Sequence, residues 1–170
     1  MISKKLSSLS IKRSCTFLTF IALNLLWSCY SYKQILSIDN IELEDGIMIN
    51  FISYSEPEQA VDNFTLKEGD KYALIIVNIS NETDLNKNID LSRTSVSNGL
   101  SLNDKRIALS KVRSGFELTG ANAKTMSVNA HQTKKAYLYY IVPKEMKVNY
   151  FYFNNSHVRL TYGEEKERMF

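Results

Sequence analysis

Short apolar runs, each closed by turn residues, constrain the fold of this chain more than any other feature of its sequence. Lys71–Ser80 and Thr133–Val142 are apolar on both faces and rich in Ile, Val or Tyr, which is typical of strands at the centre of a sheet. Asp45-Gly46 separates two alternating apolar runs and predicts a tight hairpin, because both central positions of such a turn tolerate a positive φ. Helical periodicity is scarce, so the sequence predicts an all-β domain.

About seven or eight such strands fit between residues 34 and 162, and they predict an antiparallel β-sandwich. Two of them are expected at Val148–Phe153 and His157–Tyr162, with a turn at Asn154-Asn155-Ser156 between them. Residues 103–112 fit a short helix and a strand equally well, so their structure stays open.

The first 28 residues have the three parts of an export signal. Four bases and no acids lie within residues 1–13, and Cys15–Trp27 is uncharged and mostly apolar. Such a segment predicts a secretory signal peptide, with a permanent membrane-anchoring helix as the alternative. Without these four bases, 17 Lys and Arg remain against 18 Asp and Glu. This balance argues against nucleic acid as a partner.

Leu26-Trp27-Ser28-Cys29 resembles the lipobox of bacterial lipoproteins, in which an aliphatic and a small residue precede a Cys. The resemblance implies that Cys29 is acylated and becomes the first residue, and that residues 29–33 form a short tether. Cys15 lies in the discarded segment, so the mature chain has one Cys and no disulfide of its own. We therefore expect an exported, membrane-anchored lipoprotein of the bacterial cell envelope, at the outer membrane rather than the inner one.

A second resemblance covers roughly residues 60–162. Asn81 ends a strand in a polar turn, Ala130-His131 forms a later turn, and Val142-Pro143 ends the following strand. This order is similar to that of an immunoglobulin-like domain of unknown function found in many bacterial lipoproteins. The resemblance implies an immunoglobulin-like β-sandwich without enzymatic activity. The polar residues 163–170 that follow are expected to form a frayed tail.

No arrangement of residues in the sequence indicates catalysis. His131 and His157 are far apart in the chain, and neither accompanies the residues of a zinc site or of an activated nucleophile. We therefore expect a non-enzymatic protein without a cofactor. Its expected partners are the membrane, through acyl chains on Cys29, and an envelope protein of unknown identity, for which it serves as an interaction or structural module.

Two ligand-binding alternatives remain open. Residues 81–90 are rich in oxygen ligands, and Glu82, Asp84 and Asp90 could bind calcium, although the loop lacks the Gly of an EF-hand. The tyrosine-rich strands near the C-terminus could stack against a glycan. Tyrosine is also a good strand former whose ring packs while its hydroxyl reaches water, so these residues could be purely structural.

Charge is distributed unevenly along the chain. Residues 39–104 carry a net charge of −9, and residues 105–147 carry a net charge of +7. The fold could either expose the second segment as a basic surface or interleave the two segments so that they neutralise each other. The bases that could contact an anionic surface are Lys105, Arg106, Lys111 and Arg113.

Overall fold

Strands β4 (Asp70–Asn81) and β10 (Thr133–Pro143) form the centre of the larger sheet and confirm the two long strands expected from the sequence. They pair antiparallel from Thr133↔Ser80 to Pro143↔Asp70. Each is apolar on both faces because each face is covered. Ile75 and Leu138 enter the main core, whereas Leu74 and Tyr139 form a second cluster on the other face of the sheet.

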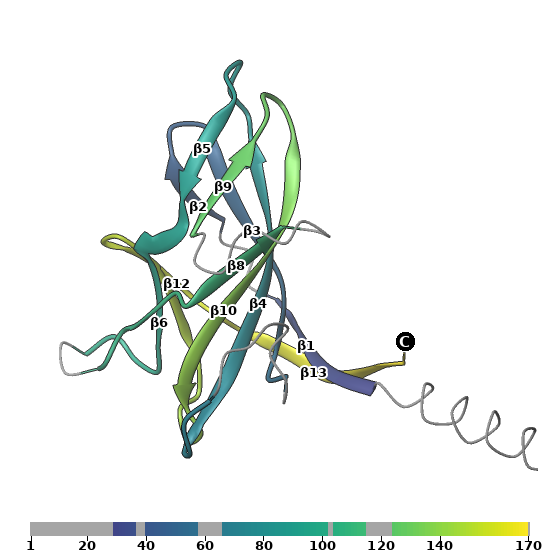
Figure 1. Cartoon of the computed structure of the whole chain (residues 1–170), viewed down its shortest axis with the longest axis vertical. Coiled ribbons are helices and arrows are strands. Elements are labelled where there is room, and N and C mark those ends of the chain that lie inside the picture. The colour runs from purple at the N-terminus through teal and green to yellow at the C-terminus, as the bar shows by residue number, and fades with distance from the viewer. Residues whose placement is uncertain (1–28, 37–39, 58–65, 102–103, 115–123, 170) are drawn as a thin grey trace, which may run out of the picture. The chain divides into compact units, whose positions relative to one another are not determined.

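The computed structural model describes residues 29–36, 40–57, 66–101, 104–114 and 124–169, among which Ser31–Lys166 form one compact unit. The larger sheet has seven strands in the order β13-β1-β3-β4-β10-β8, with β2 paired to β3 (Figure 1). Its remaining strands are β1 (Cys29–Ile35), β2 (Ile41–Glu44), β3 (Ile47–Ser55), β8 (Lys111–Ser114) and β13 (Tyr162–Met169).

A smaller sheet of four strands has the order β12-β11-β6-β7. A separate ribbon pairs β5 with β9, and a short 3-10 helix, η1 (Leu91–Arg93), joins β5 to β6. The strands of the smaller sheet and the ribbon are β5 (Lys87–Asp90), β6 (Thr94–Ser97), β7 (Ile107–Ala108), β9 (Thr125–Val128), β11 (Tyr150–Phe153) and β12 (Ser156–Arg159).

One apolar core joins the two sheets and the ribbon. It contains Ile75 and Leu138 from the larger sheet, Val96 from the smaller sheet and Ile89 from the ribbon, all fully buried. Phe51 of β3 also meets Phe151 of β11 edge to face, with ring centroids 5.0 Å apart. Side chains from the facing sheets therefore fill a shared interior, and the predicted antiparallel β-sandwich is confirmed.

Both predicted tight turns are present. Gly46 has a φ of 72° between β2 and β3, and a Cβ there would approach Thr83 Cγ2 to 2.6 Å. The position therefore needs glycine for its backbone conformation and for space. Asn154, with a φ of 52°, begins the turn between β11 and β12. Asparagine tolerates this left-handed conformation better than most residues.

The sandwich contains more strands than the seven or eight expected. Residues 94–128 hold β6, β7, β8 and β9, each of four residues or fewer, and such short strands leave too little alternation to be read from a sequence. In the open segment 103–112, the described residues contribute β7 and the start of β8, so the strand alternative is correct there. Asn103 lies outside the described residues.

The expected frayed tail is wrong, and the expected short tether at residues 29–33 is part of a strand. Residues 162–169 form β13, at the outer edge of the larger sheet, and the polar residues 164–167 have exposed side chains there. Residues 29–33 belong to β1, in which Lys33 pairs with Tyr54 of β3. The expected signal peptide, residues 1–28, lies outside the described residues. Within the described ranges, no helix has the length and apolarity of a membrane span.

Candidate functional site

The chain passes from the smaller sheet to the larger one at Leu109 and Ser110. The Leu109 amide donates to the Thr94 carbonyl of β6 at 3.2 Å, and the Ser110 amide donates to the Tyr139 carbonyl of β10 at 2.9 Å. Residues before this crossing therefore join one sheet, and residues after it join the other. This crossing separates the four bases that the sequence suggested as one anionic-surface contact.

Lys111 and Arg113 lie on the outer face of the larger sheet. Val112 between them points into the core, so these two side chains point the other way, in register with Tyr139 and Tyr137 of β10. Lys111 is only 4% exposed, and the Nε of Arg113 is buried. Of the two alternatives left open by the sequence, an exposed basic surface is therefore wrong for these two residues.

Arg106, in contrast, lies on the outer face of the smaller sheet. Its guanidinium carbon is 4.0 Å from the centroid of the Tyr152 ring, which is cation–π distance. The neighbouring His157 ring is 5.7 Å from Tyr152 and 6.3 Å from Tyr150. Phe151 lies between the two tyrosines in sequence and points into the core, so both tyrosines lie on the other face of β11, where Tyr152 is only 3% exposed beneath Arg106 and Tyr150 is half-buried.

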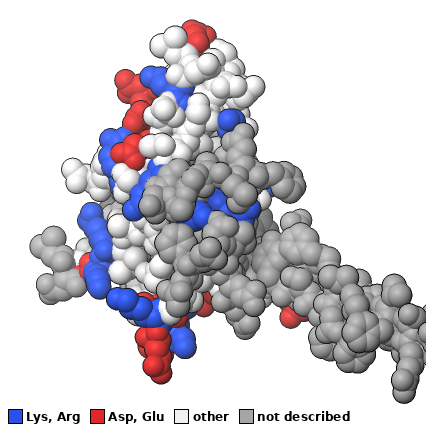
Figure 2. All heavy atoms as spheres, in the orientation of Figure 1, with Lys and Arg blue, Asp and Glu red and all other residues white. Residues whose placement is uncertain are grey.

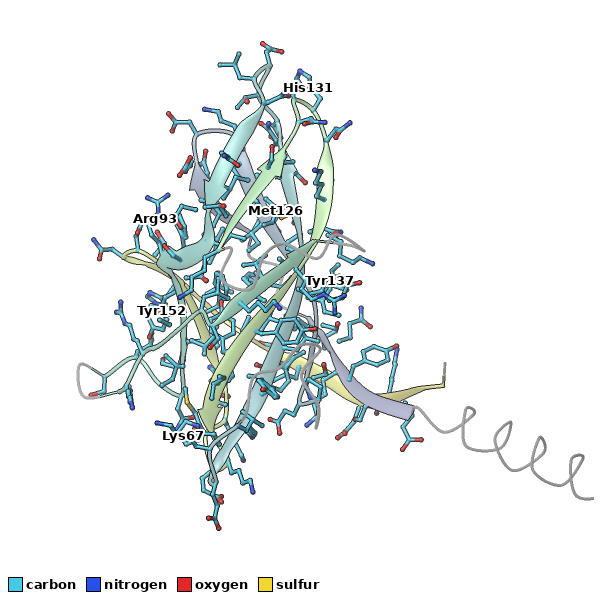
Figure 3. The ribbon with its side chains drawn as sticks, viewed as in Figure 1. Lys67, Arg93, Met126, His131, Tyr137 and Tyr152 are labelled. Carbon is cyan, nitrogen blue, oxygen red and sulfur yellow. The ribbon has the colours of Figure 1, made fainter. Side chains whose placement is uncertain are left out.

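Arg159 completes this row, because it is paired with Tyr150 in the register of β11 and β12. We call this surface the tyrosine–arginine face: Arg106, Tyr150, Tyr152, His157 and Arg159. Figure 3 shows Tyr152 on the side of the molecule formed by β6 and β12, away from Tyr137 beside β8 and β10. Lys105 is exposed and precedes Arg106.

Hydrogen bonds hold the loop that follows β6 against this face. The Tyr152 hydroxyl donates to the Gly99 carbonyl at 3.0 Å, and the Asn149 amide donates to the Asn98 carbonyl at the same distance. Next to this loop is a hollow of about 420 Å³, whose wall includes Asn98, Asn149, Tyr150, Arg159 and Thr161. A cationic surface, with Arg106 over the buried Tyr152 ring and Tyr150 half-buried, thus adjoins a depression lined by amide, hydroxyl and guanidinium groups.

Within the described ranges, nearby acids do not neutralise the charges of Lys105 and Arg106. Asp104 accepts a hydrogen bond from the Ser101 amide at 2.7 Å and so binds within its own loop. Among the described residues, neither Lys105 nor Arg106 has a salt-bridge partner. Elsewhere acidic and basic side chains are interspersed, as in the upper part of Figure 2, so the net charges of the two sequence segments do not form two simple halves.

The tyrosines do not form one platform. Tyr140 is fully buried in the core, and its hydroxyl bonds Thr94 at 2.9 Å. Tyr162 packs against Tyr54 with ring centroids 5.1 Å apart. Only Tyr150 and Tyr152 belong to the tyrosine–arginine face. The alternation of Tyr and Phe in residues 150–153 is the one sequence signal for this pair, whereas nothing in the sequence points to Arg106 as their neighbour.

The predicted calcium ligands are not brought together. The Asp90 carboxylate accepts from the Ser92 amide at 2.9 Å and caps η1. Hydrogen bonding from the Ser92 side chain, and next from its backbone amide, holds the pKa of Asp90 below its usual range. The Asp84 carboxylate lies 2.8 Å from His131 Nε2. In the ranges that the structure describes, no three His, Cys, Asp or Glu side chains lie close enough to share a metal ion. Glu82 is therefore not part of such a group either.

The polar residues of this loop instead bind each other. The Asn81 side chain is buried, donates to the Leu85 and Val128 carbonyls at 2.7 and 3.1 Å, and accepts from the Thr83 amide and hydroxyl. The Asn86 side chain accepts from the Ala130 amide at 3.0 Å. These oxygens and nitrogens join the loop after β4 to the turn before β10, a role that the sequence analysis missed.

No protein-family model matches the chain, and no curated protein matches it. Among solved structures, the chain is similar to the crystal structure of an uncharacterized β-sandwich protein from Clostridium difficile 630. The identity is 14% and the TM-score is 0.43, over 74% of this chain and 90% of that one. The sandwich assignment therefore follows from this chain's own sheets and shared core.

Proposed function

We propose that this protein is a lipid-anchored, non-enzymatic binding module of the bacterial cell envelope, which holds an acidic partner protein on the tyrosine–arginine face. The observation that supports this proposal most is the stacking of Arg106 on Tyr152 beside Tyr150 and Arg159. Tyrosine and arginine are enriched among the residues that contribute most of the free energy of protein association.

The arrangement favours binding because its side chains are already ordered. The Tyr152 ring is fixed by the hydrogen bond of its hydroxyl group, and the Arg106 guanidinium carbon lies over that ring, 4.0 Å from its centroid. Less side-chain entropy is therefore lost on association than for freely moving side chains. A stacked guanidinium still presents its N–H groups to a carboxylate, so a partner that carries Asp or Glu fits this chemistry.

The lipid anchor rests on the lipobox-like Leu26-Trp27-Ser28-Cys29. The compact unit starts at Ser31, only two residues after Cys29, and two extended residues span at most about 7 Å. An acylated Cys29 therefore keeps the module close to the membrane, and its partner is a protein that reaches this surface.

The test of the binding face uses Arg106→Gln in cells, with chemical crosslinking and recovery of the full-length protein. We expect the yield of the crosslinked partner to fall about tenfold, the equivalent of 1.4 kcal/mol of binding free energy. Lys135→Gln is the matched control, because Lys135 is exposed and lies on β10 of the other sheet. Equal yields from both variants would contradict the proposed face.

The test of the anchor compares Cys29→Ser with Cys15→Ser. In detergent phase separation, the Cys29→Ser protein should either be absent from the detergent phase or remain there as an uncut precursor of higher mass. Cys15→Ser should partition as the unsubstituted protein does, because the signal that carries Cys15 is removed. A Cys29→Ser protein of mature mass and unchanged partitioning would exclude the lipid anchor.

A second candidate function is glycan binding, which the hollow beside Tyr150 and Arg159 favours. Amide and hydroxyl groups around an aromatic ring can orient a sugar, and Arg159 would select an acidic one. An acidic polysaccharide recovered in place of a protein, and lost with Arg106→Gln, would decide for this alternative.

A further inference from the structure

Asn98-Gly99 is the one place in the sequence where a glycine follows an asparagine. The pair lies directly after β6, and both residues contribute to the wall of the hollow beside Tyr150 and Arg159. Asn98 is exposed to solvent. Gly99 is needed for space, because a Cβ there would approach Asp104 Oδ2 to 2.4 Å. The packing of this loop therefore keeps a glycine behind an exposed asparagine.

An Asn-Gly pair is prone to deamidation for a steric reason. The main-chain nitrogen of the glycine attacks Cγ, the side-chain carbonyl carbon of the asparagine, and the missing Cβ of glycine leaves room for that approach. The C–N bond of the side-chain amide breaks, the glycine amide proton passes to the departing nitrogen, and ammonia leaves behind a succinimide ring. Water then opens the ring at either carbonyl carbon. The products are aspartate and isoaspartate, each of which carries a carboxylate.

The hydrogen bonds of Asn98 come from a single neighbouring group. In the described part of the chain, its main-chain carbonyl and its side-chain Oδ1 both accept from Asn149 Nδ2, at 3.0 and 2.9 Å, and Asn98 forms no other hydrogen bond there. This bridge draws both oxygens of Asn98 to one side. Since the oxygen and the next nitrogen lie on opposite sides of a planar peptide carbon, the Gly99 nitrogen is directed away from Cγ. Asn149 thus restrains the reaction.

This restraint opens easily because it lies at the surface. Both hydrogen bonds are exposed to water, which competes for the same groups, so they open in local fluctuations far more often than the whole domain unfolds. The attacking nitrogen is also available, since none of the described residues accepts a hydrogen bond from the Gly99 amide. The reaction therefore needs only a local change at Asn98 and leaves the sandwich folded.

We propose that Asn98 deamidates in the folded protein, at a rate set by Asn149, and that the product weakens the binding of the acidic partner. A carboxylate at position 98 lies in the wall of the same hollow as Arg159, where it competes with an acidic side chain of the partner for that guanidinium. Isoaspartate also inserts a methylene group into the main chain before Gly99, whose carbonyl accepts from the Tyr152 hydroxyl at 3.0 Å. The effect on the partner rests on the proposed function, whereas the deamidation rests on the loop alone.

The first experiment incubates the whole protein in detergent in warm, mildly alkaline buffer, and peptide mapping by mass spectrometry measures aspartate and isoaspartate at each asparagine. Asn98 should convert faster than Asn155, which is also exposed and precedes Ser156. Asn149→Ala should raise the rate at Asn98 about fivefold, as for the loss of one net hydrogen bond. The rate at Asn155 should stay unchanged, which separates release of the restraint from general unfolding. Conversion at Asn98 no faster than at Asn155 would overturn the site, and an unchanged or lower rate in Asn149→Ala would overturn the restraint.

The second experiment measures the yield of the crosslinked partner from cells that carry Asn98→Asp. The yield should fall about threefold, the scale of one exposed charge pair. Asn98→Gln is the matched control, because it stays neutral and closes a ring far less readily, so its yield should equal that of the unsubstituted protein. Equal yields from Asn98→Asp and Asn98→Gln, with a loss in Arg106→Gln, would overturn the regulation. Equal yields from all three variants would overturn the proposed face, and the conversion measured in the first experiment would still stand.

Discussion

The hydroxyl groups of Thr94 and Tyr140 lie 2.9 Å apart in the core and join the smaller sheet to the larger one. Thr94 Oγ1 also donates to the Leu91 carbonyl at 2.8 Å, so Tyr140 is the donor to Thr94. Both side chains are buried, and this hydrogen bond fixes how the two layers are placed next to η1.

Tyr140→Phe should therefore lower the free energy of unfolding by about 1 kcal/mol, because one buried hydrogen bond is lost while the ring stays in place. Denaturant unfolding measures this difference. Tyr137→Phe is the control, since Tyr137 lies on the outer face beside Arg113 and should change stability by less than about 0.5 kcal/mol. A larger loss for Tyr137→Phe would argue against the special position of Tyr140.

Stability should also fall in alkaline solution. Burial raises the pKa of Tyr54, Tyr140 and Tyr162 far above the ordinary tyrosine value of about 10. Above that pH the unfolded chain loses protons that the folded protein keeps, so the free energy of unfolding decreases as pH rises.

Each of these tyrosines contributes a slope of up to about 1.4 kcal/mol per pH unit above pH 10, and the slope vanishes below it. Denaturant unfolding at increasing pH should show this decline, reduced in Tyr140→Phe. Ionisation of every tyrosine near pH 10 in the still-folded protein, seen in the phenolate absorbance, would contradict it.

Leu138 lies at the centre of the core on β10 and is fully buried. Leu138→Ala should cost about 2–5 kcal/mol of unfolding free energy, because it removes buried apolar contacts and leaves a cavity. The control is Leu85→Ala at an exposed position, which should cost little. Similar melting of the two variants would mean that β10 is not central.

Asn81 should be the most sensitive residue of its loop. Asn81→Ala removes two donors to the Leu85 and Val128 carbonyls and one acceptor used twice by Thr83. The expected loss of unfolding free energy is about 2 kcal/mol or more, since buried groups stay unpaired. Asn86→Ala, which loses one exposed hydrogen bond, should cost less, and the reverse order would refute this account.

Strands that are covered on both faces could be predicted from the sequence. β4 and β10 carry continuous apolar residues because they lie in the middle of the larger sheet. The Asp45-Gly46 pair predicts the hairpin between β2 and β3 because both residues tolerate a positive φ. Side-chain type alone contains this information, so no knowledge of distant contacts was needed.

Residues 104–114 could not be predicted in the same way. Their two short strands belong to different sheets, and the crossing at Leu109 and Ser110 depends on partners in β6 and β10. Proximity in sequence suggested that Lys105, Arg106, Lys111 and Arg113 act together, but the crossing directs them to different faces. The candidate site therefore keeps Arg106, with Lys105 beside it, and gains Tyr152 from a strand more than forty residues later.

β13 has a consequence for how copies of the protein behave when they are crowded. It is the outermost strand of the larger sheet, and the free edge of such a strand can template the addition of a further chain. Glu164, Glu165 and Lys166 follow one another along it with exposed side chains. A neighbour pairing there would have to bring its own charges against these, so the polar composition of β13 protects the sheet from growing into a fibril.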